Sequence, residues 1–110
     1  MKLRRAVRRG FGETVHAVVA DSPENPQRGI LYIVEEEGVP WCAVLECPCH
    51  CGDVIHLSLV EHDRPRWSIM IDDHDRPTLS PSINRVVGCR SHFFIRAGRV
   101  VPAHQAVARR

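Results

Sequence analysis

Two short cysteine-containing segments, about forty residues apart, constrain the fold of this chain most strongly. The first, CPCHCG (47–52), has cysteines at alternate positions, and the second, CRSHFF (89–94), places a histidine three residues after a cysteine. Zn²⁺ takes thiolate sulfur at about 2.3 Å and imidazole nitrogen at about 2.0 Å, usually in a tetrahedron. We therefore predict that the two segments bind one Zn²⁺ ion and so tie the middle of the chain to its end.

Five side chains compete for the four positions of such a site. They are Cys47, Cys49, Cys51, Cys89 and His92. We expect Cys49, Cys51 and Cys89 to be ligands, with either His92 or Cys47 as the fourth. Three cysteines on a fully extended segment would lie too far apart for one tetrahedron, so a turn is expected at CHCG, where Gly52 permits a tight backbone.

A structural role is the first expectation for a site so rich in cysteine, because catalytic zinc usually keeps an open position. Buried or redox-active thiols are the alternative reading. Cys42 lies in the apolar run WCAVLE and is expected to pack in the core rather than to bind metal.

The chain of 110 residues is expected to form a single domain, 1–110, in which residues 1–12 and the tail 102–110 are flexible. No apolar run approaches the roughly 20 residues needed to cross a bilayer, and the basic start lacks the features of a signal peptide. We therefore expect a cytoplasmic protein, with no membrane partner. Thiols stay reduced in that compartment, which favours metal binding over disulfides.

The hydrophobic pattern favours strands. Six short runs are rich in β-branched or aromatic residues and partly alternate, with turn signals between them. They span residues 14–20, 30–36, 41–46, 54–60, 66–72 and 92–97. The clearest alternation is found in two of the runs. It sets Ile55, Leu57 and Leu59 against His56, Ser58 and Val60, and Trp67, Ile69 and Ile71 against Ser68, Met70 and Asp72. The expected fold is therefore an all-β or β-rich small domain, with little helix, stapled by the metal site.

Charge is strongly segregated along the chain. All 13 acidic residues lie between Glu13 and Asp75, whereas residues 76–110 contain arginines and no acid. A basic face able to hold an acidic partner is one interpretation; mutual neutralisation of the ends and the middle is the other. Aromatic residues make up only 5% of the chain and no nucleic-acid motif is present, so nucleic acid is not an expected partner.

Three groups could perform chemistry. The segment PTLSPSI (77–83) is expected to be a proline-punctuated loop that presents Ser80 and Ser82. Ser91 lies beside His92 in the sequence, and a serine next to a histidine base is a candidate pair for acyl transfer. Asp53, beside Cys51, could instead act on a metal-bound water. The simpler reading of the serines is that they form turns.

The ordered motifs GILYIVEE, CPCHCG, RWSI, RPTLSPSI and GCRSHFFIRAGRV resemble a family of small, uncharacterised bacterial proteins. Their genes often lie beside genes for ubiquitin-like modifiers and for E1-like and E2-like enzymes. The resemblance covers roughly residues 29–101 and implies a metal-binding accessory protein. Family positions of metal-ligand type match the five candidates above, and a Pro-Ser element matches Pro81 and Ser82. The chain departs from the family at His50, where members tend to carry glycine.

The leading hypothesis is a zinc-binding protein of a bacterial ubiquitin-like pathway that processes or deconjugates the modifier as a peptidase. In a serine mechanism Ser82 is the nucleophile and His92 the base; in a metal mechanism Asp53 is the base. The implied partners are the modifier and the E1-like and E2-like enzymes. The alternative is a zinc module without enzymatic activity that docks the modifier or a conjugation enzyme. His92 cannot be both metal ligand and catalytic base.

Overall fold

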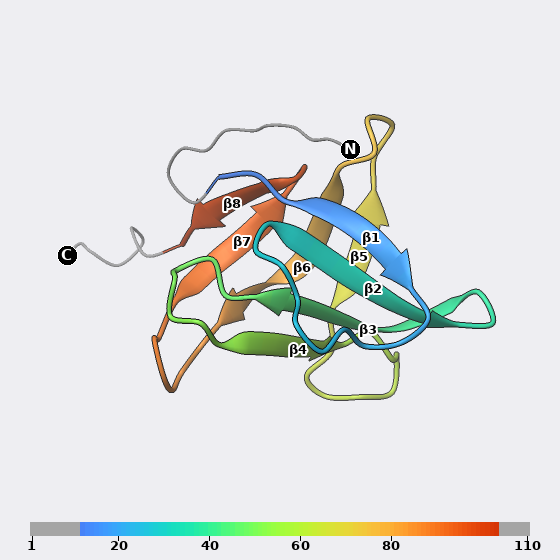
Figure 1. Ribbon diagram of the computed structural model, residues 1–110, viewed down its shortest axis with the longest axis horizontal. Coiled ribbons are helices and arrows are strands. Elements are labelled where there is room, and N and C mark those ends of the chain that lie inside the picture. Colours follow the sequence, from blue (N-terminus) through green and yellow to red (C-terminus); the bar gives the residue numbers. More distant parts are fainter. Residues whose placement is uncertain (1–11, 104–110) are drawn as a thin grey trace.

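The computed structural model describes residues 12–103, which form eight β-strands and no helix (Figure 1). The strands are β1 (Val15–Val19), β2 (Ile30–Glu36), β3 (Val39–Glu46), β4 (Val54–Ser58), β5 (Ser68–Ile71), β6 (Pro77–Asn84), β7 (His92–Arg96) and β8 (Arg99–Pro102). The predicted class, a small β-rich domain, is confirmed. Residues 12–103 contain no helix that could cross a bilayer. The ends predicted to be flexible lie almost wholly outside this range, although Pro102 ends β8 and Ala103 is buried.

The first sheet has the strand order β1-β2-β3-β4, in which β1 and β2 are parallel and the other neighbours antiparallel. A parallel pair needs a crossover connection, and residues 20–29 supply it without a helix by passing over β3 and β4 (Figure 1). The Gln27 amide donates to the Tyr32 hydroxyl (3.1 Å), and Arg28 Nη2 donates to the Pro48 carbonyl (3.4 Å). The crossover is thereby fastened to the sheet and to the loop that holds three of the cysteines.

The second sheet has the order β5-β6-β7-β8, and all its neighbours are antiparallel. Residues 12–14, which lead into β1, also form backbone hydrogen bonds with β8 and with the turn between β7 and β8. The Thr14 amide donates to the Gly98 carbonyl (2.7 Å), and the Val100 amide donates to the Gly12 carbonyl (3.3 Å). Backbone hydrogen bonds therefore join the two sheets near the start of the first sheet.

Strand β6 corrects the sequence analysis, which predicted a loop over residues 77–83. Proline has no N–H to donate, so within sheets it is confined to first residues, edges and bulges. Pro77 is the first residue of β6, and Pro81 falls between Leu79 and Ile83, where the register with β7 shifts. Both Leu79 and Ile83 are buried, so packing holds the strand on each side of the irregularity. β8 was also not among the predicted strands.

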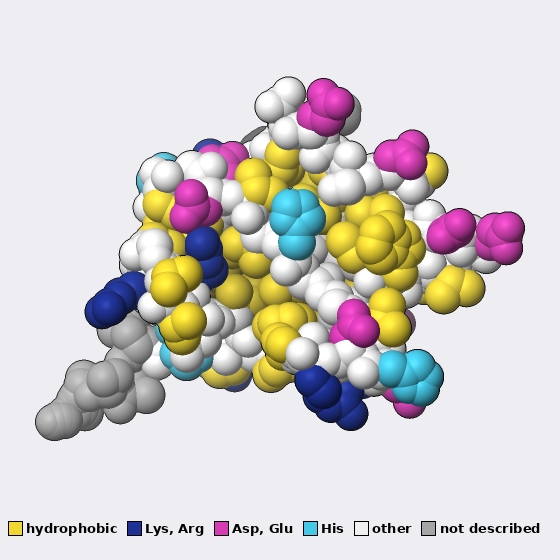
Figure 2. Space-filling view, turned by 90° about the horizontal axis from the view of Figure 1, so that it is seen from below, with side chains coloured by type: hydrophobic (Ala, Val, Ile, Leu, Met, Phe, Trp, Pro, Cys, Tyr) yellow, Lys and Arg dark blue, Asp and Glu magenta, His cyan; other side chains and the backbone are white. Residues whose placement is uncertain are grey.

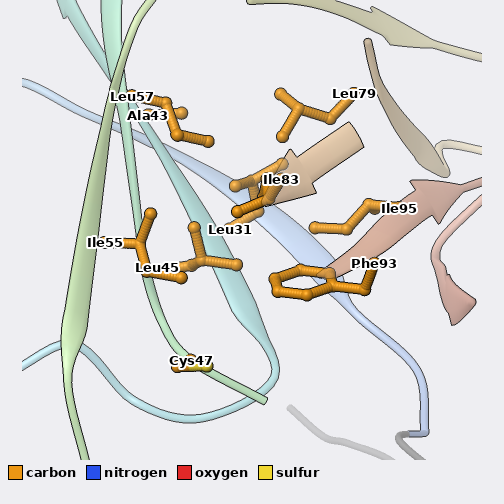
Figure 3. Packing of buried hydrophobic residues seen from close by; sticks show 10 residues of the cluster. All are labelled: Leu31, Ala43, Leu45, Cys47, Ile55, Leu57, Leu79, Ile83, Phe93 and Ile95. Carbon is orange, nitrogen blue, oxygen red and sulfur yellow. The ribbon is translucent and has the colours of Figure 1, made fainter. Parts of the chain in front are cut away.

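The core fills the space between the sheets, and Figure 3 shows side chains from both pointing toward one another. The first sheet contributes Leu31, Ala43, Leu45, Ile55 and Leu57, and the second contributes Leu79, Ile83, Phe93 and Ile95. The predicted alternation is confirmed in β4, because Ile55 and Leu57 are buried and His56 is exposed, but it fails at Ile71, which is exposed at the end of β5. Cys47 lies at the lower edge of the cluster in Figure 3 and is fully buried. The core therefore reaches the cysteine site.

Cys42 packs in a separate small cluster with Val34 and Val44, against which Val19 and Tyr32 lie. It is 8% exposed, and it does not belong to the group of cysteines that approach one another. The prediction that Cys42 is a packing residue is confirmed.

Candidate functional site

Four cysteine sulfur atoms converge where a loop of the first sheet meets a loop of the second. The first cysteine loop (residues 47–53) joins β3 to β4, and the second cysteine loop (residues 85–91) joins β6 to β7. The sulfur atoms of Cys47, Cys49, Cys51 and Cys89 all lie within 4.8 Å of one another. Cys47 Sγ is 3.5 Å from Cys49 Sγ and 3.7 Å from Cys89 Sγ. A tetrahedron with metal–sulfur bonds of about 2.3 Å has sulfur–sulfur edges of about 3.8 Å, so the four atoms fit one tetrahedral ion.

Left-handed backbone conformations bend both loops around this point. In the first cysteine loop φ is 79° at His50 and 88° at Gly52, and in the second it is 71° at Gly88 and 61° at Arg90. The turn expected at CHCG is present, and it is what brings the three alternate cysteines together. Glycine adopts such angles without strain, whereas histidine and arginine adopt them at a cost.

The thiol environments are unequal. The side-chain and backbone hydrogen bonds from Ser91 stabilise the Cys89 thiolate and lower the pKa of that thiol to about 6. At Cys51 the Asp53 amide favours the thiolate, but desolvation and the neighbouring sulfur atoms outweigh it and raise the pKa to about 12. Burial raises the pKa of Cys47. Holding all four sulfurs as thiolates therefore calls for a cation among them.

Polar groups around the sulfur atoms suit a site of negative charge. Ser91 Oγ lies 3.1 Å from Cys89 Sγ and 3.8 Å from Cys47 Sγ. Arg85 Nη1 donates to Cys89 Sγ (3.8 Å), and its Nη2 donates to Asp53 Oδ2 (3.2 Å). Four thiolates around a divalent ion would keep a net negative charge, which the Arg85 guanidinium would partly offset. Partners of this kind orient ligands and tune a metal site.

His92 is set apart from the sulfur atoms and pairs with Ser82. Ser82 Oγ and His92 Nε2 are 2.9 Å apart, and both side chains are half-buried. The two residues lie on the antiparallel neighbours β6 and β7, on the face opposite Ile83 and Phe93 of the core. The Ala103 amide donates to the His92 carbonyl (3.0 Å), and Trp67 Nε1 donates to the Ser82 carbonyl (3.2 Å). The backbone on each side of the pair is thereby fixed.

The structure thus brings the sequence-predicted residues together in two groups. Four of the five metal candidates converge, and the fifth, His92, faces Ser82. Asp53 joins neither the sulfur group nor the serine–histidine pair; it forms an ion pair with Arg85. Ser80 is exposed and lies opposite Ser68 in β5.

One of two hollows in the surface adjoins these groups. It has a volume of about 200 Å³ and is lined by His92 and by parts of both cysteine loops, including Pro48, Cys49 and Ser91. The other, of about 540 Å³, lies over the first sheet beside Trp41 and His56 and touches neither group. A ligand in the smaller hollow would therefore contact His92.

Sequence reasoning missed Arg85, Trp67 and the contacts of Ser91 with sulfur. Their roles depend on distances between chain segments, and a lone arginine four residues before a cysteine carries no local signal. Ser91 was noticed only as the neighbour of His92.

Comparison with protein families gives one match. A family model described as bacterial ubiquitination-like system serine protease (BubE) matches residues 18–103. Comparison with curated proteins and with solved structures finds no significant match. The matched range contains all four converging cysteines, Ser82 and His92.

Proposed function

Since the chain belongs to the BubE family of bacterial ubiquitination-like system serine proteases, we propose that it is a peptidase in which Ser82 is the nucleophile and His92 the base. The observation that carries this proposal is the 2.9 Å contact between Ser82 Oγ and His92 Nε2. A nucleophile and base within hydrogen-bond reach are the signature of covalent catalysis by serine. The convergence of four cysteines supports it further, because it leaves His92 free of the metal.

The chemistry follows from this geometry. With the ring proton on Nδ1, His92 Nε2 accepts the hydrogen bond of the Ser82 hydroxyl and takes its proton as Oγ attacks the substrate carbonyl carbon. The imidazolium then gives that proton to the leaving amine, so that the amide C–N bond breaks and an ester to Ser82 remains. Water, activated by the same ring, hydrolyses the ester. Trp67 and Ala103 hold the two backbones in register for these steps.

The metal of this proposal is zinc, bound by Cys47, Cys49, Cys51 and Cys89. Four thiolates close the coordination shell, so the ion supplies structural stability. Its contribution is to hold the second cysteine loop, from which His92 follows directly. Asp53 acts through its ion pair with Arg85 rather than as a base.

The proposed substrates are ubiquitin-like modifiers, cleaved at the C-terminus of a precursor or at the bond to a conjugated protein. The E1-like and E2-like enzymes of the same pathway are the proposed partners, as the family resemblance implies. The proposed setting is the bacterial cytoplasm, where reducing conditions keep the four thiols able to bind zinc.

A fluorophosphonate probe tests the nucleophile directly, because it labels serines that a neighbouring base activates. We expect the probe to label Ser82, with the modified peptide identified by mass spectrometry. Ser82→Ala and His92→Gln should abolish labelling and reduce cleavage of a modifier–reporter fusion by at least about a thousandfold. Ser80→Ala, on the same strand, is the matched control and should be labelled like the wild type.

Zinc content and thermal unfolding, measured on every variant, separate loss of chemistry from loss of fold. Wild-type protein that contains zinc, is folded and neither reacts with the probe nor cleaves the fusion would contradict the peptidase. That result would favour the alternative, a zinc module that docks the modifier.

A further inference from the structure

A continuous strip of side chains runs from the serine–histidine pair along the outer face of β7. Residues alternate between the two faces of a strand. Phe93 and Ile95 point into the core and are buried, so His92, Phe94 and Arg96 share the outer face. Arg96 is the exposed residue of the three and ends the strip.

Successive contacts connect the strip. The ring centroids of His92 and Phe94 are 6.3 Å apart, and the Arg96 Cζ atom lies 3.9 Å from the centroid of the Phe94 ring. A guanidinium stacked on an aromatic ring is held by a cation–π interaction while the N–H groups at its edge remain available. Phe94 therefore orients Arg96 at a fixed place relative to Ser82.

Arg96 has a second arginine beside it. Arg99 lies directly opposite Arg96 in the β7–β8 pair, and side chains opposite one another share a face. Glu13 pairs with Arg99 on its other side, so the acidic residue that the sheet places next to these arginines lies opposite Arg99 and not opposite Arg96. Neither arginine forms an ion pair with any described residue. Figure 2 shows acidic side chains at the far right, where the β2–β3 hairpin projects, and also at other places on that face.

We propose that Arg96, oriented by Phe94, is a specificity residue that binds an Asp or Glu side chain of the substrate. The proposal rests on the proposed function, because Ser82 and His92 fix where the cleaved bond lies. Four residues along a strand span about 13 Å, so the acidic residue lies about four positions from that bond in an extended substrate. The substrate class is then a protein with an acidic segment close to its cleavage point.

Protection of Ser82 from the fluorophosphonate probe tests this without requiring that a test peptide be cleaved. The experiment compares two mixtures of decapeptides with acetylated N-termini and amidated C-termini. Each peptide of one mixture contains a single Glu, and each peptide of the other a single Lys; all other positions are random and uncharged. With the wild type we expect the Glu mixture to protect at a roughly two- to fivefold lower concentration, the scale of one exposed charge pair. Added salt should weaken this preference.

Arg96→Glu should invert the preference, so that the Lys mixture protects better. Each variant is normalised to its own labelling without peptide. Arg64→Glu, an exposed arginine in the β4–β5 loop, is the matched control and should keep the wild-type preference. Two results would overturn this inference alone. In the first, the probe labels Ser82 but both mixtures protect it equally; in the second, the Arg96→Glu protein still prefers the Glu mixture. Failure of Ser82 to react in the folded wild type overturns the proposed function and this inference with it.

Discussion

Gly52 is the last residue but one of the first cysteine loop, with φ at 88°, and an added Cβ would meet no atom within 4 Å. The effect of Gly52→Ala is therefore confined to the backbone, and an L-residue in the left-handed region costs about 1–2 kcal/mol. We expect this variant to lose that amount of unfolding free energy in urea titrations. It should also bind zinc more weakly in competition with a chromogenic chelator, because the loop that presents Cys49 and Cys51 is strained.

Gly38 offers a matched control for this prediction. Its φ is 80°, an added Cβ there would also meet no atom within 4 Å, and it lies in the β2–β3 hairpin, away from the cysteine loops. Gly38→Ala should lose a similar amount of stability and keep the wild-type affinity for zinc. Equal zinc affinities in the two variants would show that the Gly52 conformation is not needed by the metal site.

At the scale of residues, the sequence pointed to the candidate side chains but not to how they group in the fold. The C-x-x-H spacing made His92 and Cys47 equal candidates for the fourth metal ligand, and the serine next to His92 made the histidine a candidate base as well. The pairing of β6 with β7 places His92 Nε2 2.9 Å from Ser82 Oγ, while Cys47 joins the sulfur group. Strand pairing is a long-range property that spacing does not encode.

At the scale of elements, strands with regular alternation were predictable and β6 was not. Its two prolines are strong turn signals, and they outweighed the apolar Leu79 and Ile83 in the sequence analysis. In the fold the prolines occupy the first position and the irregularity of β6, where a missing N–H is tolerated. Ser82, the proposed nucleophile, therefore lies on a strand braced by its neighbours rather than on a loop.

The β5–β6 turn makes a prediction about pH. Asp72 Oδ1 accepts hydrogen bonds from the His74 and Arg76 amides (2.9 and 3.0 Å), and Oδ2 accepts one from Arg76 Nε (3.1 Å). These contacts, with the Arg76 amide as the largest contribution, lower the pKa of Asp72. A carboxyl group with a lower pKa in the folded state stabilises the fold above its unfolded pKa, near 3.9, and loses that effect as the pH falls through its folded pKa.

Asp72→Asn should therefore be less stable than the wild type at neutral pH, and the difference should shrink below about pH 4. Urea unfolding at several pH values measures it, with Asp73→Asn as the exposed neighbouring control. Loss of the proposed zinc in acid should affect all three proteins alike and so cancel in the comparison. A difference that stays constant down to pH 3 would contradict the proposed role of the Asp72 carboxylate.

At the scale of the whole molecule, the cysteine cluster joins a loop of the first sheet to a loop of the second, about forty residues further along the chain. The roughly forty-residue spacing of the two motifs made such a staple predictable, and the β-rich class followed from the strand pattern. The division into two sheets and the parallel β1–β2 pair were not predictable, because residues 20–29 read as a turn-rich loop and carry no sign of a crossover.

Removal of the metal should therefore affect the entire fold. Structural zinc contributes about 10 kcal/mol or more in zinc-finger peptides, which is comparable with the whole stability of a small domain. We expect a strong chelator to unfold the protein or lower its melting temperature sharply, and to abolish fluorophosphonate labelling of Ser82 because the loop before His92 loses its anchor. Elemental analysis should find one zinc per chain in the wild type and in Cys42→Ser, which changes a packing cysteine, and none in Cys47→Ser. A metal-free chain that keeps both its melting temperature and its reactive serine would show that the sheets hold together without the staple.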